Sequence, residues 1–283
     1  MKIDIIQDRL KHYDLRSKQA KENAIKEICQ EVALAGLARE NFFKTAMFQG
    51  GTCLRIMHGL KRFSEDLDFI LMTPNKAFDW EPYLRAITVE FEAFGLSLEV
   101  IDRSEADNTI KKAFLKEGSF GKVLNLQYSR VPSDKQKILI KLEVDTNPPD
   151  GSIPETHYLD YPYPFSIVTQ NIPSLFAGKC HALLCREYIK GRDWFDFIWY
   201  IQNKHKVNFP FLKNALEQCG PYQNTTISMS NDWLCTALEN KINALDWKVV
   251  AADVLKFLPA ELSHLIDHWD KPMFLALLNK LDA

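Results

Sequence analysis

The pattern of apolar and polar positions divides the chain into two halves of different character. In the first half, apolar residues recur at helical spacing in three segments: residues 14–38, 52–60 and 80–94. Strand-like patterns occupy four others: residues 64–72, 97–103, 123–130 and 137–145. The second half predicts helices throughout, over residues 174–190, 192–203, 209–218, 232–244, 247–257 and 271–281. We therefore expect an α+β fold, with a mixed sheet followed by a C-terminal helical bundle.

Turn chemistry indicates how these elements are joined. Residues 132–134 read Pro-Ser-Asp, a combination typical of turns, so the two strands around them should form an antiparallel hairpin. Residues 147–164 contain five prolines and are expected to be a loop. We place a domain boundary there, with an α/β domain over residues 1–160 and a helical domain over residues 161–283.

Two aspartates on the predicted strand 64–72 are the strongest chemical signal in the chain. Side chains alternate faces along a strand, so Asp66 and Asp68 share one face while Leu67 and Phe69 point to the other. Two close carboxylates repel each other unless a cation lies between them, and paired oxygen ligands suit Mg2+. The alternative is a solvated strand end. We expect a metal site.

A Gly50-Gly51-Thr52 turn precedes this strand and leads into the predicted helix 52–60. Glycine lets backbone N–H groups approach phosphate oxygens, and the start of a helix adds partial positive charge. The pattern alone is weak, because most such turns only begin a helix. Neither GxxxxGK nor GxGxxG occurs, so neither a P-loop nor a Rossmann fingerprint competes with this interpretation. The turn and the aspartates together predict a triphosphate site.

The predicted strand 137–145 supplies a third acid. If its isoleucines, leucine and valine are buried, then Lys141, Glu143 and Asp145 share the opposite face. A carboxylate there could complete a metal site and accept the proton of an attacking hydroxyl. We favour Glu143 over Asp145, because Asp145 lies at the strand end. An ordinary amphipathic strand is the alternative.

Basic and acidic residues follow in the helical half. Three basic residues share one narrow stripe of the predicted helix 174–190: Lys179, Arg186 and Lys190. Such a stripe could neutralise a triphosphate. Asp193 and Asp196 lie one turn apart at the start of the next predicted helix. Structural alternatives are a first-turn acid favoured by the helix dipole and an ion pair between Arg192 and Asp196.

Composition adds a basic segment and excludes some classes. The formal net charge is -2, yet residues 111–141 carry eight basic and two acidic residues, so this segment is +6 and the remainder is -8. It could draw polyanions to one face, or it could be a lysine-rich solvated hairpin. No apolar run approaches the ~20 residues needed to span a bilayer. Six cysteines without a CxxC pair indicate free thiols. We expect a cytoplasmic protein with no membrane partner.

With these residues assembled, the chain resembles the AbiEii/AbiGii-type nucleotidyltransferases, which include toxins of type IV toxin–antitoxin pairs and the related MenT toxins. The resemblance spans residues 49–199. Its motifs are Gly50-Gly51-Thr52, Arg62-Phe-Ser-Glu-Asp-Leu-Asp68, Glu143 on its strand, Lys179-x-x-Ala182-x-x-x-Arg186 and Arg192-Asp193-x-x-Asp196. The Asp-x-Asp core alone is shared by the whole DNA polymerase β-like superfamily.

The resemblance implies a polymerase β-like fold and Mg2+-dependent transfer of a nucleoside monophosphate from an NTP to an acceptor hydroxyl. Catalytic roles would fall to Asp66, Asp68, Glu143 and Asp196, the first three also as metal ligands. Nucleotide contacts would come from Gly50, Gly51, Thr52, Arg62, Ser64, Lys179, Arg186 and Asp193. In some members the acceptor is the 3′ end of tRNA, and a cognate antitoxin is the expected partner. Alternatives are a protein AMPylase or UMPylase and a non-catalytic nucleotide-binding module.

Overall fold

The computed structural model describes residues 5–13, 15–102, 119–128 and 136–281. Within the predicted basic segment, residues 111–141, residues 111–118 and 129–135 lie outside them. The chain forms two compact units that alternate along the sequence. The sheet unit comprises Met1–Cys53, Ser64–Pro148 and Glu155–Thr169, and the helical unit comprises Leu54–Phe63, Pro149–Pro154 and Gln170–Ala283. The predicted division at residue 160 treats each domain as one continuous segment, whereas each of these units is made of three.

A seven-stranded mixed sheet forms the frame of the sheet unit, in the order β3-β4-β5-β2-β1-β7-β6. Its strands are β1 (Ala46–Gln49), β2 (Asp66–Leu71), β3 (Ser97–Asp102), β4 (Ser119–Tyr128), β5 (Gln136–Asp145), β6 (Pro154–Leu159) and β7 (Phe165–Gln170). Strand β2 runs parallel to β5 and antiparallel to β1, while β4 and β5 form the predicted antiparallel hairpin. The predicted α+β class is confirmed.

One strand lies where the sequence predicted a loop. Strand β6 occupies the proline-rich segment, so the expectation of a loop over residues 147–164 is wrong for these six residues. The strand is at the edge of the sheet and begins with Pro154. Proline is tolerated at the first residue of an edge strand, because its missing N–H is not needed there. Most of the strand is exposed, so it carries little of the apolar alternation that marks a buried strand.

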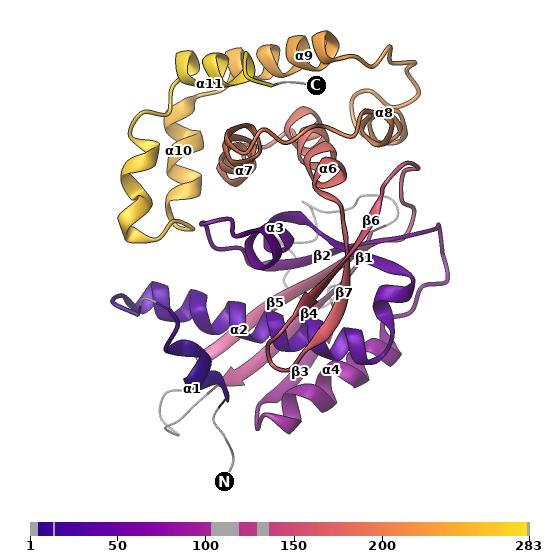
Figure 1. Cartoon of the computed structure of the whole chain (residues 1–283), viewed down its shortest axis with the longest axis vertical. Helices are drawn as coiled ribbons and strands as arrows, with labels where there is room; N and C mark the ends of the chain where they lie inside the picture. Colours follow the sequence, from indigo (N-terminus) through magenta and orange to yellow (C-terminus); the bar gives the residue numbers. More distant parts are fainter. Residues whose placement is uncertain (1–4, 14, 103–118, 129–135, 282–283) are drawn as a thin grey trace. The chain divides into compact units, whose positions relative to one another are not determined.

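Helices α1 (Ile5–Leu10), α2 (Lys18–Arg39) and α4 (Glu81–Ala93) complete the sheet unit. Ser17 caps the start of α2, and its side chain accepts a hydrogen bond from the backbone of Ala20 at 3.0 Å. It packs against α4 and reaches β5, and Figure 1 shows it lying across the sheet. Between α2 and β1, the short 3-10 helix η1 (Phe42–Lys44) contributes rings to the core.

An aromatic cluster fixes the orientation of β2. The ring of Phe69 lies 4.9 Å from that of Phe42, 5.5 Å from that of Phe48 and 6.3 Å from that of Trp80, measured between centroids. Phe69 and its neighbour Leu67 are almost completely buried. Turning the strand over would expose both side chains at a cost of about 1.5–3 kcal/mol each. The alternate residues of β2 are therefore held on the opposite face.

The helical unit contains α6 (Ile172–Cys185), α7 (Gly191–Gln202), α8 (Phe209–Gln218), α9 (Asn231–Ala244), α10 (Trp247–Leu255), η2 (Ala260–Ile266) and α11 (Lys271–Leu278). Helix α6 packs against α7, α8 and α9, while α10 lies against α7. In its core the rings of Trp247 and Phe274 are stacked, and Trp194 packs edge-on against both. Among the described helices, none is long and apolar enough to cross a membrane.

The helix predicted over residues 174–190 is too long at its C-terminal end. Helix α6 stops at Cys185, and Arg186 adopts an extended backbone with ψ 133°. The next residue after the predicted end, Gly191, begins α7. A β-carbon on Gly191 would lie 2.1 Å from the carbonyl oxygen of Val250 in α10, so only glycine fits this helix contact. Close packing of α7 on α10 therefore determines where the chain turns.

Candidate active site

Asp66 and Asp68 share one face of β2, as predicted. They alternate with Leu67 and Phe69, which are buried, while both aspartates are partly exposed. Strand β2 lies between β1 and β5 in the middle of the sheet. The aspartates are thus presented from a rigid element, with their backbone positions set by neighbours on both sides.

Glu143 joins the two aspartates on the same face. Strands β2 and β5 are parallel, with Asp66 beside Lys141 and Asp68 beside Glu143 in register. Neighbouring strands lie about 4.8 Å apart, and paired residues point to the same side of a sheet. Asp145 pairs with Ile70, further along β2 and away from the aspartates. Glu143 is therefore better placed than Asp145 to share a ligand with Asp68.

The glycine turn lies directly against Asp68. Helix α3 (Gly50–His58) starts two residues earlier than predicted, so Gly50 and Gly51 form its first turn. Gly50 has φ +81°, and a β-carbon there would lie 2.5 Å from Oδ2 of Asp68. The buried Thr52 hydroxyl donates a hydrogen bond to the backbone carbonyl of Asp66. The turn is therefore joined to the aspartate strand by a hydrogen bond and by close contact.

These acids have the right chemistry for a divalent metal ion. Carboxylate oxygens are the ligands that hard cations prefer. Asp66 and Asp68 are two residues apart on β2, and Asp68 is paired with Glu143 on β5. Within the residues that the structure describes, no three His, Cys, Asp or Glu side chains converge closely enough to hold a metal. Like-charged carboxylates repel each other without a cation between them. The three carboxylates therefore have the chemistry of a metal site, and binding would require their side chains to turn toward one ion.

Arg62 and Ser64 precede strand β2 in the sequence. Arg62 is buried in the helical unit, where its Nε and Nη2 each donate to Asp196 at 2.6 Å. Its Nη1 donates to the carbonyl of Phe63 at 3.0 Å. The carbonyl of Ser64 accepts from the side chain of Gln30 at 3.2 Å. These contacts are structural, and nucleotide contacts by Arg62 and Ser64 stay predictions.

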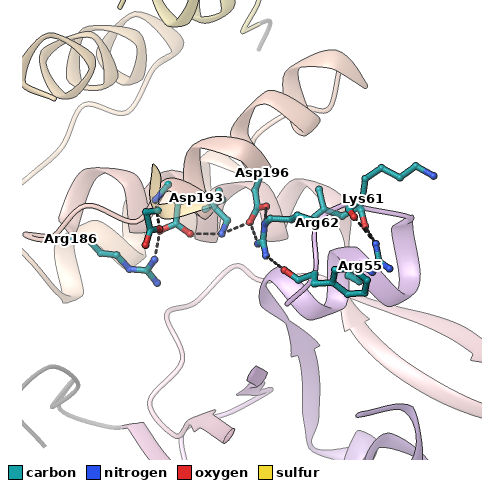
Figure 2. A network of polar contacts seen from close by, with 11 residues as sticks. Arg55, Lys61, Arg62, Arg186, Asp193 and Asp196 are labelled. Atoms are coloured by element: carbon teal, nitrogen blue, oxygen red, sulfur yellow. Dashed lines mark hydrogen bonds and ion pairs between the residues drawn. The ribbon is translucent and has the colours of Figure 1, made fainter. Parts of the chain in front are cut away.

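A row of alternating charges crosses the helical unit (Figure 2). Lys179 Nζ lies 2.7 Å from Oδ1 of Asp193 and 2.7 Å from Oδ2 of Asp196. Arg186 donates from Nη1 to Oδ2 of Asp193. The Arg62–Asp196 pair completes the row, which we call the charge cluster. Lys179 is thus held between two carboxylates, with its side chain 10% exposed.

Both aspartates of the charge cluster are ionised at neutral pH. Burial by itself would raise the pKa of Asp193, but Lys179, Arg186 and Lys190 outweigh it and hold that pKa well below its ordinary value. Burial likewise opposes ionisation of Asp196, and Arg62 with Lys179 lowers its pKa. The oxygens of Asp196 are fully buried and already bonded, so the structure gives them no exposed position toward a substrate.

Sequence reasoning found the members of the charge cluster but not all of its contacts. Lys179 and Arg186 do not share a helix stripe, because α6 ends before Arg186. They still meet, because the side chains of both residues contact Asp193, which lies on α7. Asp196 bonds to Arg62 and Lys179, and the Arg192 guanidinium lies 4.0 Å from the Phe257 ring centroid. The Arg62–Asp196 contact joins residues 134 positions apart, for which no local signal exists.

Comparison with known proteins identifies the family. Residues 32–279 match the description "Nucleotidyl transferase AbiEii toxin, Type IV TA system". The chain belongs to the AbiEii family. It is therefore a nucleotidyltransferase, and the predicted resemblance is confirmed. Nucleotidyltransferases of this kind generally use a divalent metal with an NTP, and a type IV toxin–antitoxin family implies an antitoxin partner.

Two solved structures from Helicobacter pylori are similar to this AbiEii protein. One is described as a "putative nucleotidyltransferase from H. pylori"; it is 17% identical with a TM-score of 0.50, over 94% of this chain and 99% of that chain. The other, JHP933, is 15% identical with a TM-score of 0.47, over 94% and 89% of the two chains. The first shows that the fold is shared. No curated protein matches the sequence.

Proposed function

We propose that this protein transfers a nucleoside monophosphate from an NTP to a hydroxyl of RNA in a Mg2+-dependent reaction, with the tRNA 3′ end as the leading acceptor. The observation that carries the proposal is the face shared by Asp66, Asp68 and Glu143, with Gly50 packed against Asp68. Family membership supports its place as the toxin of a toxin–antitoxin pair.

The proposed step is an in-line displacement. The acceptor oxygen forms a bond to the α-phosphorus, the bond from that phosphorus to the β-bridging oxygen breaks, and pyrophosphate leaves. Bound Mg2+ would neutralise charge on the attacking and leaving oxygens. The residues of this chain would mainly orient the reactants, because phosphoryl transfer requires little covalent participation from the protein.

Each strand acid has a proposed part in this step. Asp66 and Asp68 would hold the metal, and Glu143 would complete the ligand set and take the hydroxyl proton as it leaves the acceptor oxygen. The first turn of α3, at Gly50, Gly51 and Thr52, offers backbone N–H groups and a positive helix end to phosphate.

In the helical unit, Lys179 and Arg186 are proposed phosphate-binding cations, and Asp193 and Asp196 hold them in place. We assign Asp196 to positioning rather than to direct catalysis, because its oxygens are fully buried against Arg62 and Lys179. A buried acid with bonded oxygens fixes a lysine without touching the substrate.

The test uses purified protein, MgCl2, total RNA and each of the four α-labelled NTPs in turn. We expect one NTP to label RNA, with the label lost on RNase treatment and placed by 3′-end sequencing. Asp68→Asn should lose transfer activity while its far-UV circular dichroism spectrum stays that of wild type. The control is Asp79→Asn, at an exposed acid of the same unit, which should keep transfer activity. Label that survives RNase and runs with protein would contradict the RNA proposal in favour of AMPylation or UMPylation.

A further inference from the structure

A short turn after helix α3 carries Arg62 into the charge cluster. This turn, residues 60–63, belongs to the helical unit, as does the last part of α3. At its start, the backbone N–H of Leu60 donates to a carbonyl of α3 at 3.1 Å. At its end, the N–H of Phe63 donates to the carbonyl of Phe257 at 2.8 Å. Backbone hydrogen bonds therefore hold both ends of the turn.

Arg55, in the last turn of α3, holds the middle of this turn through its side chain. Its Nη1 donates to the backbone carbonyl of Lys61 at 2.7 Å and to that of Leu60 at 3.1 Å (Figure 2). Its Cζ lies 4.4 Å from the centroid of the Phe63 ring, so the cation also packs on an aromatic ring of the turn. Hydrogen bonds from a charged group are stronger than neutral ones, so these contacts together leave the turn little freedom.

Arg62 connects the turn to the lysine of the charge cluster. Its Nε and Nη2 donate to the two oxygens of Asp196, each at 2.6 Å, and Nζ of Lys179 lies 2.7 Å from the same carboxylate. The side chains of Arg62 and Asp196 are 2% and 0% exposed. A buried pair with two parallel hydrogen bonds tolerates little displacement. A shift of the turn would therefore reach Lys179 through Asp196.

We infer that Arg55 is a positioning residue for nucleotide binding. It fixes the turn that carries Arg62, and through Asp196 it fixes Lys179. This inference rests on the proposed function, in which Lys179 binds phosphate. The alternative is that Arg55 contributes only its positive charge. Lys61 separates the two, because its exposed side chain lies on the same turn while its backbone carbonyl, which any substitution leaves in place, accepts from Arg55.

Calorimetric titration with α,β-methylene analogues of the four NTPs and excess MgCl2 measures nucleotide binding without RNA. Arg55→Met should bind the preferred analogue at least about 10-fold more weakly, as expected if the turn is in place in about one tenth of the molecules. Lys61→Met removes a charge from the same turn and should bind as wild type. Arg55→Lys keeps the charge but loses the planar guanidinium, and should bind about 3-fold more weakly.

A double-mutant cycle with Arg62→Lys tests whether Arg55 acts through Arg62. If both substitutions disturb the same connection, the double variant should bind within about 2-fold of the weaker single variant. Independent effects on binding would multiply instead. The cycle therefore separates positioning through Arg62 from a general loosening of the fold, which would add to any other substitution.

Exchange of the Arg62 Nε–H with solvent gives a second readout that needs no ligand. This proton is buried and bonded to Asp196, so its signal in a 15N-resolved NMR spectrum should exchange slowly in wild type. Because local opening sets the exchange rate of a buried proton, Arg55→Met should speed it by at least about 10-fold. Lys61→Met should leave the rate unchanged.

Each outcome decides the assignment. Wild-type affinity or unchanged Arg62 exchange in Arg55→Met would overturn the positioning role while the proposed function stood. So would multiplicative effects in the cycle, or a loss in Lys61→Met equal to that in Arg55→Met. If Arg55→Met did not fold, binding by Arg55→Lys no weaker than that by Lys61→Met would overturn it. If wild type bound none of the four analogues, the proposed function would fail, and the exchange rate would still show whether Arg55 holds the turn.

Discussion

Replacing Gly50 by alanine tests whether the glycine turn positions Asp68. The new methyl group would lie 2.5 Å from Oδ2 of Asp68, where contacts below 3.0 Å are essentially never seen. The carboxylate must therefore move by at least half an ångström. A misplacement of about 1 Å can cost on the order of 10²-fold in rate, so we expect a smaller but measurable loss of transfer here. The positive φ of +81° adds about 1–2 kcal/mol of strain, and the overlap adds about 1–3 kcal/mol.

Gly59→Ala is the matched control for this experiment. Gly59 follows the same helix with φ +73°, yet nothing lies within 4 Å of the β-carbon that alanine would add. It should show the conformational strain alone, about 1–2 kcal/mol, with transfer close to wild type. The assays are denaturant unfolding and initial rates with a labelled NTP. Wild-type transfer by Gly50→Ala, with a stability loss equal to that of Gly59→Ala, would refute the positioning role of the turn.

Three further predictions concern the helical unit. Gly191→Ala should lower the melting temperature and raise the KM for NTP, because its methyl group overlaps the carbonyl of Val250; a wild-type thermal melt would contradict this close packing. Arg62→Met should destabilise the fold by less than the ~3–5 kcal/mol of a fully unpaired buried charge, because Asp196 loses its two hydrogen bonds from Arg62 but keeps its ion pair with Lys179. Adding Asp196→Leu should restore part of that loss, and a double variant no more stable than the single one would count against the pair. The depressed pKa of Asp193 contributes stability that is present above pH 4 and lost as pH falls below it, so Asp193→Asn should flatten the acid limb of stability against pH.

The local geometry of the strand site was predictable because it depends on alternation. One sheet face buried Leu67 and Phe69, and this alone placed Asp66 and Asp68 together on the other. The same argument placed Glu143 on its own strand. That β2 and β5 are neighbours with Asp68 beside Glu143 required tertiary structure, because pairing between distant strands leaves no periodic signal.

The charge cluster shows what sequence patterns could not supply. Helical spacing grouped Lys179 with Arg186, yet the helix ends between them and the grouping arises through Asp193 instead. The turn at Gly191 depends on the backbone of a helix about 60 residues later, so it could not be read locally. The contact of Asp196 with Arg62 was likewise invisible, because the two residues lie 134 positions apart.

The most direct test of the account compares the fate of two labels on the same NTP. With RNA and MgCl2, an α-labelled NTP should leave its label in the RNA, and a γ-labelled NTP should release its label as pyrophosphate. Both signals should disappear in Asp66→Asn and Asp68→Asn proteins that melt like wild type, and on chelation of the metal. Transfer of the γ-label instead, or unchanged incorporation of the α-label in the two variants, would contradict a nucleotidyltransferase site at these aspartates.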